Sequence, residues 1–166
     1  MIAAPPTLAP AGAQRRALRA ALLIGIGLGG FVDGIVLHQM LQWHQMLSAR
    51  LPPLSVMSKN INMFYDVVFH AGCWLVTLWG VVALWRALPA AGPARLPLRL
   101  LWGGLLMGWA LFNVAEGLVG HHLLHLHNVR EITPHVAAYN WGFLLLSVGI
   151  GALGWLLARR ARQAAP

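Results

Sequence analysis

The chain of 166 residues is 58% hydrophobic and only 10% charged, with a mean hydropathy of +0.65, and this composition excludes an ordinary soluble domain. The formal net charge of +8 does not indicate a nucleic-acid partner, because the arginines stand at the ends of apolar segments, where they would meet lipid headgroups. A single cysteine, Cys73, excludes an internal disulfide and any CxxC redox or zinc motif. The composition therefore predicts an integral membrane protein whose partner is the lipid bilayer.

Four apolar segments predict an all-α fold, an integral membrane four-helix bundle. The Ala- and Pro-rich tail of residues 1–17 is expected to be disordered, and a single four-span domain is expected over residues 18–160. The predicted spans are residues 20–47, 63–88, 98–124 and 136–158. The first segment is too long for a signal peptide and carries Asp33 at its centre, so we interpret it as the first transmembrane helix.

The distribution of Lys and Arg predicts the orientation of the spans. The N-terminus, the middle loop and the C-terminus carry three each, whereas the first loop has Arg50 and Lys59 and the third loop has Arg130 alone. The positive-inside rule therefore places both termini in the cytoplasm. All eight histidines then lie toward the periplasmic face.

The first and third spans predict an internal repeat. Asp33-Gly34-Ile35-Val36-Leu37-His38 aligns with Glu116-Gly117-Leu118-Val119-Gly120-His121, and a second histidine follows six residues later in each copy, His44 and His127. The repeat predicts two duplicated helical hairpins related by an axis along the membrane normal. Sites in such proteins tend to lie at the interface between the repeats.

The segment from Asp33 to His44 places one acid and two imidazoles in one predicted span. On an ideal helix His44 lies only ~20° round from Asp33, whereas His38 points ~140° away. We therefore expect that one helix cannot bring the three groups together and that other helices complete the site. Asp33, roughly 7.5 Å deeper than His38, is expected to orient the site and not to bind an ion.

Histidines and carboxylates from three spans fall at similar depth, and ionisable groups inside a membrane are costly and usually functional. Imidazole suits copper, zinc and iron, and carboxylate suits the harder iron, so the pattern predicts a transition-metal site, with copper or iron favoured and zinc a third choice. The predicted metal ligands are His38, His44, Asp66, His70, Glu116, His121, His122 and His125. The residues predicted to support them are Asp33, Gln42, Asn113 and Asn140.

Several residues carry a second interpretation. His127 and His135 fit interfacial side chains as well as ligands. The methionines of the same half could serve copper(I), although methionine at helical spacing is more often a core residue; they are Met40, Met46, Met57 and Met63. A structural hydrogen-bond network across the bundle is the alternative to a metal site.

Motifs in all four spans resemble those of a bacterial family of predicted membrane proteins known as domain of unknown function twenty-two forty-three. They are Phe31–Gln39, Gln42-Trp43-His44, Asp66–His70, Gly108–Asn113 and Glu116–Leu124. The resemblance implies a four-helix inner-membrane protein without an established activity. Family members tend to carry Asp near the start of the last span, where this sequence has Asn140.

The function that we favour from the sequence is a membrane metalloprotein that holds one or two ions of copper or iron, and that acts as a metal-dependent oxidoreductase on a lipid-soluble or small substrate. The first alternative is a metallochaperone or assembly factor for a copper respiratory enzyme. The second is an electron carrier with haem between His38 and His121. A permeation protein is a further alternative, and a homo-oligomer or a respiratory complex is the expected assembly.

Overall fold

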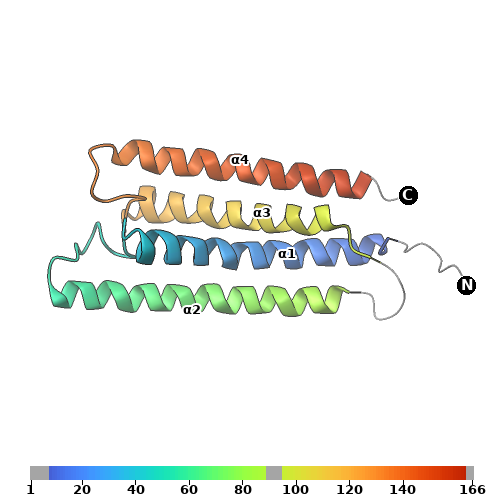
Figure 1. Ribbon diagram of the computed structural model, residues 1–166, viewed down its shortest axis with the longest axis horizontal. Coiled ribbons are helices and arrows are strands. Elements are labelled where there is room, and N and C mark those ends of the chain that lie inside the picture. Colours follow the sequence, from blue (N-terminus) through green and yellow to red (C-terminus); the bar gives the residue numbers. More distant parts are fainter. Residues whose placement is uncertain (1–7, 89–94, 164–166) are drawn as a thin grey trace, which may run out of the picture.

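The computed structural model describes residues 8–88 and 95–163, and these residues form long helices joined by irregular loops (Figure 1). The elements in chain order are α1 (Ala11–Val32), the π-helix η1 (Asp33–Met40), α2 (Val56–Ala87), α3 (Leu98–Glu116), the π-helix η2 (Gly117–Leu123) and α4 (Val136–Gln163). Counting each π-helix with the α-helix that it extends, four helices are long and apolar enough to cross a membrane. The predicted all-α, four-span bundle is confirmed.

Helices α1 and α3 form the centre of the bundle. In the part of the chain that the structure describes, α1 packs against α2 and α3, and α3 packs against α4, so that α2 and α4 lie on the two outer sides (Figure 1). The helices α1 and α3 run in the same direction, and both end on the side of the molecule opposite the two termini. The ends of α1 and α3 therefore lie next to each other.

Glycines explain the close contact between α1 and α3. A Cβ atom at Gly108 would collide with the carbonyl oxygen of Leu22 and would lie 2.9 Å from the backbone nitrogen of Ile26. A Cβ atom at Gly25 would likewise collide with the carbonyl oxygen of Leu105. Small residues allow two membrane helices to approach backbone to backbone, which is the packing expected where no hydrophobic force draws helices together.

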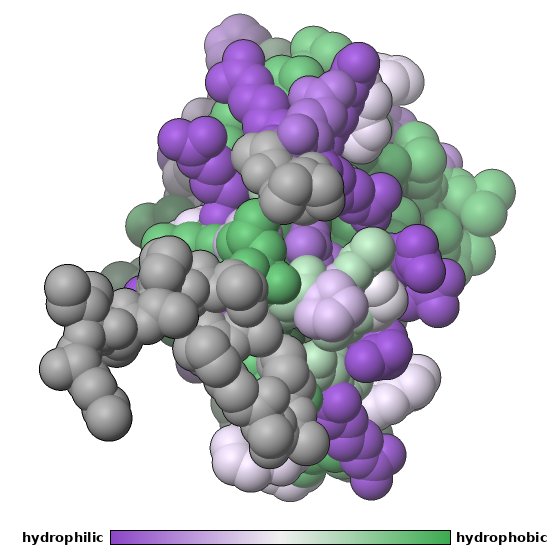
Figure 2. All heavy atoms as spheres, turned by 90° about the vertical axis from the view of Figure 1, so that its right-hand side faces the viewer, coloured by the Kyte–Doolittle hydropathy of each residue, from purple (hydrophilic) through white to green (hydrophobic). Residues whose placement is uncertain are grey.

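Charged residues are divided between the two ends of the bundle. Hydrophilic side chains gather at the end near the termini (Figure 2). Nine arginines belong to the helix ends on this side: Arg15, Arg16, Arg19, Arg86, Arg95, Arg99, Arg159, Arg160 and Arg162. The four acidic residues and eight histidines belong to the other half of the bundle and its loops, while large apolar side chains such as Trp79 and Leu145 are exposed along the outer helices.

The first span begins and ends earlier than predicted. Residues 1–7 lie outside the described residues, but α1 begins at Ala11, so the predicted disordered tail of residues 1–17 is too long. Alanines bury this first part of α1 against the bundle, and Gln14 donates from Nε2 to the carbonyl oxygen of Ala9 at 2.8 Å. The span ends at Met40 and not near residue 47, because the chain turns at Gln42 with φ 51°.

The second helix also begins earlier than predicted, at Val56 and not near residue 63. Ser55 is the N-cap, its side chain accepts from the backbone nitrogen of Ser58, and Ser58 returns a bond to the backbone of Ser55. This capping box fixes the start of a helix independently of apolar pattern. Residues 41–55 are therefore a loop that covers the end of the bundle.

Candidate metal centre

Both central helices change from α to π geometry at their acidic residue, Asp33 in the first and Glu116 in the second. In η1 the backbone nitrogen of Leu41 donates to the carbonyl oxygen of Val36 at 2.8 Å, and in η2 that of Leu124 donates to Val119 at 2.8 Å, so that residues five apart are paired. π-helical turns are rare and occur frequently at functional sites. The wider turn places Asp33 beside His38, so the expected separation of about 140° between these two side chains is wrong.

The second histidine of each segment returns to the first because the chain reverses after the π-helix. The reversal uses Gln42 with φ 51° in the first half and His125 with φ 49° in the second. Backbone hydrogen bonds between residues six apart then close the two turns. They join Trp43 N to Leu37 O at 2.9 Å and Leu126 N to Gly120 O at 2.8 Å. One chain segment therefore brings an acid and two histidines together, which the ideal-helix argument excluded.

The described part of the chain contains two groups of metal-type residues, by which we mean acids and histidines placed so that they could share a metal ion. The first group consists of Asp33, His38 and His44. All three are buried, and each offers one ligand atom within 4.8 Å of the others. The Nε2 atom of His38 lies 3.1 Å from one oxygen of Asp33, and that of His44 lies 3.8 Å from the other oxygen. Neither nitrogen makes a hydrogen bond within the described residues, so both face the carboxylate without being bonded to it.

The second group consists of Glu116, His121 and His127, and it has the same composition. Oxygen Oε1 of Glu116 lies 2.9 Å from Nε2 of His121 and 3.2 Å from Nε2 of His127, and the three ligand atoms lie within 4.8 Å of one another. Both oxygens of Glu116 and both ring nitrogens of His121 are buried without a hydrogen-bond partner in the described chain. Buried polar atoms are normally bonded, so such a cluster calls for an explanation such as an ion.

The two groups are neighbours. The rings of His44 and His127 stack with centroids 4.5 Å apart and planes 14° apart. The ring of His127 also lies 5.9 Å from that of His38 and 4.9 Å from that of His121. Four imidazoles from the two halves of the chain therefore form one buried cluster at the adjacent ends of α1 and α3.

The two loops that cover this cluster are bonded to each other. Backbone bonds join Ala49 N to Leu126 O at 3.0 Å and Glu131 N to Trp43 O at 3.0 Å. The carboxylate of Glu131 also accepts from the hydroxyl of Ser48 at 2.9 Å. Glu131, the only acid of the chain outside the metal-type cluster and its supports, therefore holds the cover in place.

Two contacts fix the imidazoles of the first group from behind. The Nδ1 atom of His38 lies 3.0 Å from Oδ1 of Asp66, and Nδ1 of His44 lies 2.9 Å from the carbonyl oxygen of Val129. Carboxylate and carbonyl oxygens accept, so Nδ1 of each imidazole donates in these contacts and Nε2 is left facing Asp33. Metal-binding histidines are usually held by such contacts.

Burial keeps the two loop histidines neutral. Loss of solvent lowers the pKa of His44 to about 4 and lowers the pKa of His127 as well. The neutral imidazole is the form that binds a metal ion, so both rings are ready to act as ligands at neutral pH.

Four of the predicted ligands lie outside the two groups: Asp66, which is described below, and three histidines. The imidazole of His70 donates from Nδ1 to the carbonyl oxygen of Asp66 at 2.8 Å, and a Cβ atom at Gly34 would collide with its Nε2. The ring of His122 packs on Trp141 with centroids 4.7 Å apart. His125 is exposed at the chain reversal.

The predicted supporting residues also separate. Asp66, predicted as a ligand, lies behind His38 in a supporting position, whereas Gln42 is exposed at the turn. Asn113 is buried in α3, one turn before the second group. Asn140 accepts from the backbone nitrogen of Val129 at 3.0 Å and so holds the loop that follows His127.

Two members of the groups, Asp33 and His127, are not among the predicted ligands. Asp33 was expected only to orient the site, and His127 was left between a ligand and an interfacial side chain. The signal that identifies His127 was present in the sequence, because it occupies the position of His44 in the second copy of the pattern. The apolar pattern of the sequence does not distinguish a π-helix from an α-helix, and it is the π-helix η1 that places Asp33 beside His38.

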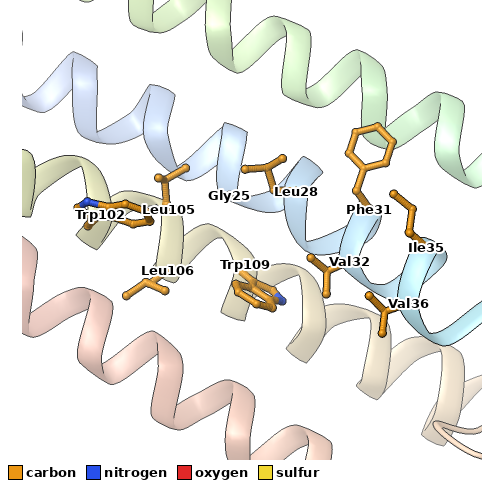
Figure 3. Close-up of a pocket in the computed structure, with 10 residues that line it drawn as sticks. All are labelled: Gly25, Leu28, Phe31, Val32, Ile35, Val36, Trp102, Leu105, Leu106 and Trp109. Atoms are coloured by element: carbon orange, nitrogen blue, oxygen red, sulfur yellow. The ribbon is translucent and has the colours of Figure 1, made fainter. Parts of the chain in front are cut away.

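An apolar groove of about 330 Å³ lies beside the cluster, between α1 and α3 (Figure 3). It is lined by Gly25, Leu28, Phe31, Val32, Ile35, Val36, Trp102, Leu105, Leu106 and Trp109. The lining contains no ionisable residue, so this groove is not the metal-type site. Ile35 and Val36 belong to η1, which also carries Asp33 and His38.

Comparison with known proteins agrees with this architecture. The sequence matches the family described as "Predicted membrane protein (DUF2243)" over residues 20–161, which include all of the metal-type residues of both groups. No curated protein and no solved structure matches the chain. Because the match extends over most of its length, the chain belongs to the predicted membrane protein family DUF2243.

Proposed function

We propose that this chain is a membrane metalloprotein that holds two transition-metal ions, one at Asp33, His38 and His44 and one at Glu116, His121 and His127. The observation that carries the proposal is the pair of buried groups in which carboxylate oxygens and Nε2 atoms face one another within 4.8 Å. Nε2 of His38, of His44 and of His121 is buried without a hydrogen-bond partner in the described chain, as expected for atoms directed at a shared ion.

Iron is the metal that we propose first. Two histidines and one carboxylate with open positions form the ligand set typical of non-haem iron(II) oxygenases, and the same set is known for catalytic zinc. Copper(I) prefers thioether or thiolate ligands, but Met40, Met57 and Met63 are largely exposed to the surroundings. Copper is therefore the second choice and zinc the third.

Redox chemistry on a lipid-soluble substrate is the activity that we propose for these ions. Iron at such a site would supply one-electron and oxygen chemistry, and the chain would supply the ligands and a buried environment. The stacked rings of His44 and His127 place the two groups close enough to act together. The apolar groove beside η1 supports a hydrocarbon-rich substrate, because its lining residues Leu28, Ile35 and Trp102 are also exposed on the outer surface.

The two halves are proposed to be duplicated hairpins. Support comes from the equivalent acids and histidines, the two π-helices and the matched turn bonds described above. Support for a periplasmic metal site comes from the arginines, which belong to the end of the bundle opposite the cluster. We propose the bacterial inner membrane with both termini in the cytoplasm.

The geometry argues against the two alternatives from the sequence. Haem between His38 and His121 requires an open gap between these two rings, whereas the ring of His127 lies close to both, 5.9 Å from that of His38 and 4.9 Å from that of His121. A metallochaperone exchanges its ion through accessible ligands, whereas all four clustered imidazoles are buried.

The test is metal analysis of the purified protein in detergent. The protein is loaded anaerobically with iron(II), copper(I) or zinc(II), freed of unbound metal and analysed for metal per chain. We expect two iron ions for the native chain and one for each of the variants His38→Ala and His121→Ala. The control is His135→Ala, which removes an exposed histidine outside both groups and retains two ions.

Two results would overturn the proposal. The first is a protein that binds none of the three metals under any loading condition. The second is unchanged metal content in both His38→Ala and His121→Ala. An optical scan of the protein as isolated separates the haem alternative, because bound haem gives a Soret band and the proposed centres do not.

A further inference from the structure

The two groups have the same composition, but the contacts behind their histidines differ. In the first group each Nδ1 atom has an acceptor, Asp66 for His38 and the carbonyl oxygen of Val129 for His44. In the second group Nδ1 of His121 and Nδ1 of His127 are buried and have no partner within the described residues. The difference therefore lies in the supports and not in the ligands.

Asp66 in the first half of the chain and Asn140 in the second half occupy corresponding positions behind the two groups. Asp66 accepts from the backbone nitrogen of Met46 at 2.8 Å, and Asn140 accepts from that of Val129 at 3.0 Å. Met46 and Val129 each lie two residues after the second histidine of their group. Both side chains thus fix the same loop position with an Oδ1 atom.

The remaining contacts of these two side chains are different. Oδ1 of Asp66 also accepts from Nδ1 of His38 at 3.0 Å. The amide nitrogen of Asn140 instead donates to Oδ1 of Asn128 at 2.9 Å, and His121 receives no support from it. Both bonds of Asp66 are made by Oδ1, whereas Oδ1 of Asn140 is bonded only to the loop. An amide oxygen is neutral, so even where it has two lone pairs it is a weaker acceptor for an imidazole than a carboxylate oxygen.

Such a carboxylate changes the ligand that it holds. It fixes the ring orientation, keeps the proton on Nδ1 and makes Nε2 a stronger donor to the metal. Loss of such a carboxylate typically weakens metal affinity by about 10–100-fold. We expect a difference of about this size between the metal affinities of the two groups. On the basis of the proposed function, we infer that the two metal centres are inequivalent. Asp66 is a positioning residue that makes Asp33, His38 and His44 the tighter centre, and the group of Glu116, His121 and His127 is the weaker centre, which exchanges its ion first.

The test is a titration of the metal-free protein in detergent with cobalt(II), followed by the visible ligand-field absorption of the bound ion. Native protein is expected to fill in two steps whose dissociation constants differ by about 10–100-fold. Asp66→Asn keeps the acceptor for Met46 but weakens the acceptor for His38. It should weaken the tighter step by about 10–100-fold, shift its absorption bands and leave the weaker step unchanged.

Single-centre variants assign the two steps. In His121→Ala, which keeps the first group, the remaining step should be the tighter one, and adding Asp66→Asn should weaken it. In His38→Ala the remaining step should be the weaker one, and adding Asp66→Asn should have no effect. The control is His135→Ala, which removes an exposed histidine outside both groups, and it should leave both steps in place.

Each result decides the inference. Two equal steps in the native protein, or equal affinities in His121→Ala and His38→Ala, would overturn it while leaving the proposed metal function intact. Absence of cobalt(II) and of the other metals from the native protein would overturn both. The comparison of His121→Ala with His38→Ala decides the question even if Asp66→Asn does not fold.

Discussion

Gly120 gives a direct way to disturb one of the two proposed metal centres without the other. It lies in η2 between Glu116 and His127, and a Cβ atom there would lie 2.8 Å from Oε1 of Glu116 and 3.3 Å from Nε2 of His127. Ordinary van der Waals contact begins at 3.4 Å, so the carboxylate oxygen must retreat by 3.4 − 2.8 = 0.6 Å or more. The corresponding position of the first group is Leu37, which already carries a side chain.

The size of this displacement predicts the effect of Gly120→Ala. Metal–ligand distances tolerate about 0.2 Å, so an oxygen moved by 0.6 Å no longer fits a common ion with the two histidines. The carboxylate stands at the end of a flexible side chain and can turn away, so the cost in folding free energy should stay below the ~1–3 kcal/mol of a rigid overpacked core. We expect the metal content to fall from two ions to one.

The assay is the iron content after anaerobic loading, measured together with the stability of the protein toward denaturing detergent. The matched control is Gly142→Ala, because a Cβ atom there has no neighbour within 4 Å. It should retain two ions and gain about 0.5–1 kcal/mol from the higher helix propensity of alanine. Native affinity at two centres in Gly120→Ala would refute the placement of an ion between Glu116 and His127.

Three further predictions concern the frame of the site. Gly108→Ala should destabilise the bundle by about 1–3 kcal/mol in a detergent denaturation series, because its Cβ atom would lie 2.9 Å from Ile26 N. Gly149→Ala should not destabilise it, because a Cβ atom there has no neighbour within 4 Å. Equal stability of both variants would contradict the close contact between α1 and α3. Gln42→Val should lower the free energy of unfolding by about 1–2 kcal/mol, because a β-branched residue disfavours φ 51°, and Gln42→Gly should be tolerated; the reverse order would count against the turn. Burial lowers the pKa of His44 from 6.5 to about 4, so the unfolded chain binds the proton more readily than the folded chain. The contribution of His44 to the stability of the metal-free protein should therefore be present above pH 6.5 and fall by on the order of 3 kcal/mol as the pH drops to 4. The loss between pH 6.5 and 4 should be smaller in His44→Gln, and equal losses in both proteins would contradict this.

Much of the architecture is determined by the sequence itself. Apolar segments of spanning length, interrupted by Pro- and Arg-rich connections, leave an all-α membrane bundle as the fold that satisfies every backbone polar group in lipid. The aligned Asp33–His38 and Glu116–His121 segments also predicted that the acid and the two histidines would recur in the second half of the chain. These features depend on composition and spacing, which are properties of the linear sequence.

The tertiary structure decided which residues meet. An ideal helix separates Asp33 from His38, and only the i to i+5 geometry of η1 places them 3.1 Å apart. His44 and His127 lie beyond the helices, and only the reversals at Gln42 and His125 return them to the cluster.

The assignment of Asp66 also required the structure. Spacing places it on the face of α2 that carries His70, which favoured a ligand, but its oxygen lies behind His38 and its partner in the second half is an asparagine. The sequence by itself determined the fold and the kinds of ligand, because these follow from hydrophobic length and residue chemistry. The tertiary structure alone decided the two groups and their different supports, because these follow from local departures from the α-helix and from contacts between segments far apart in the chain.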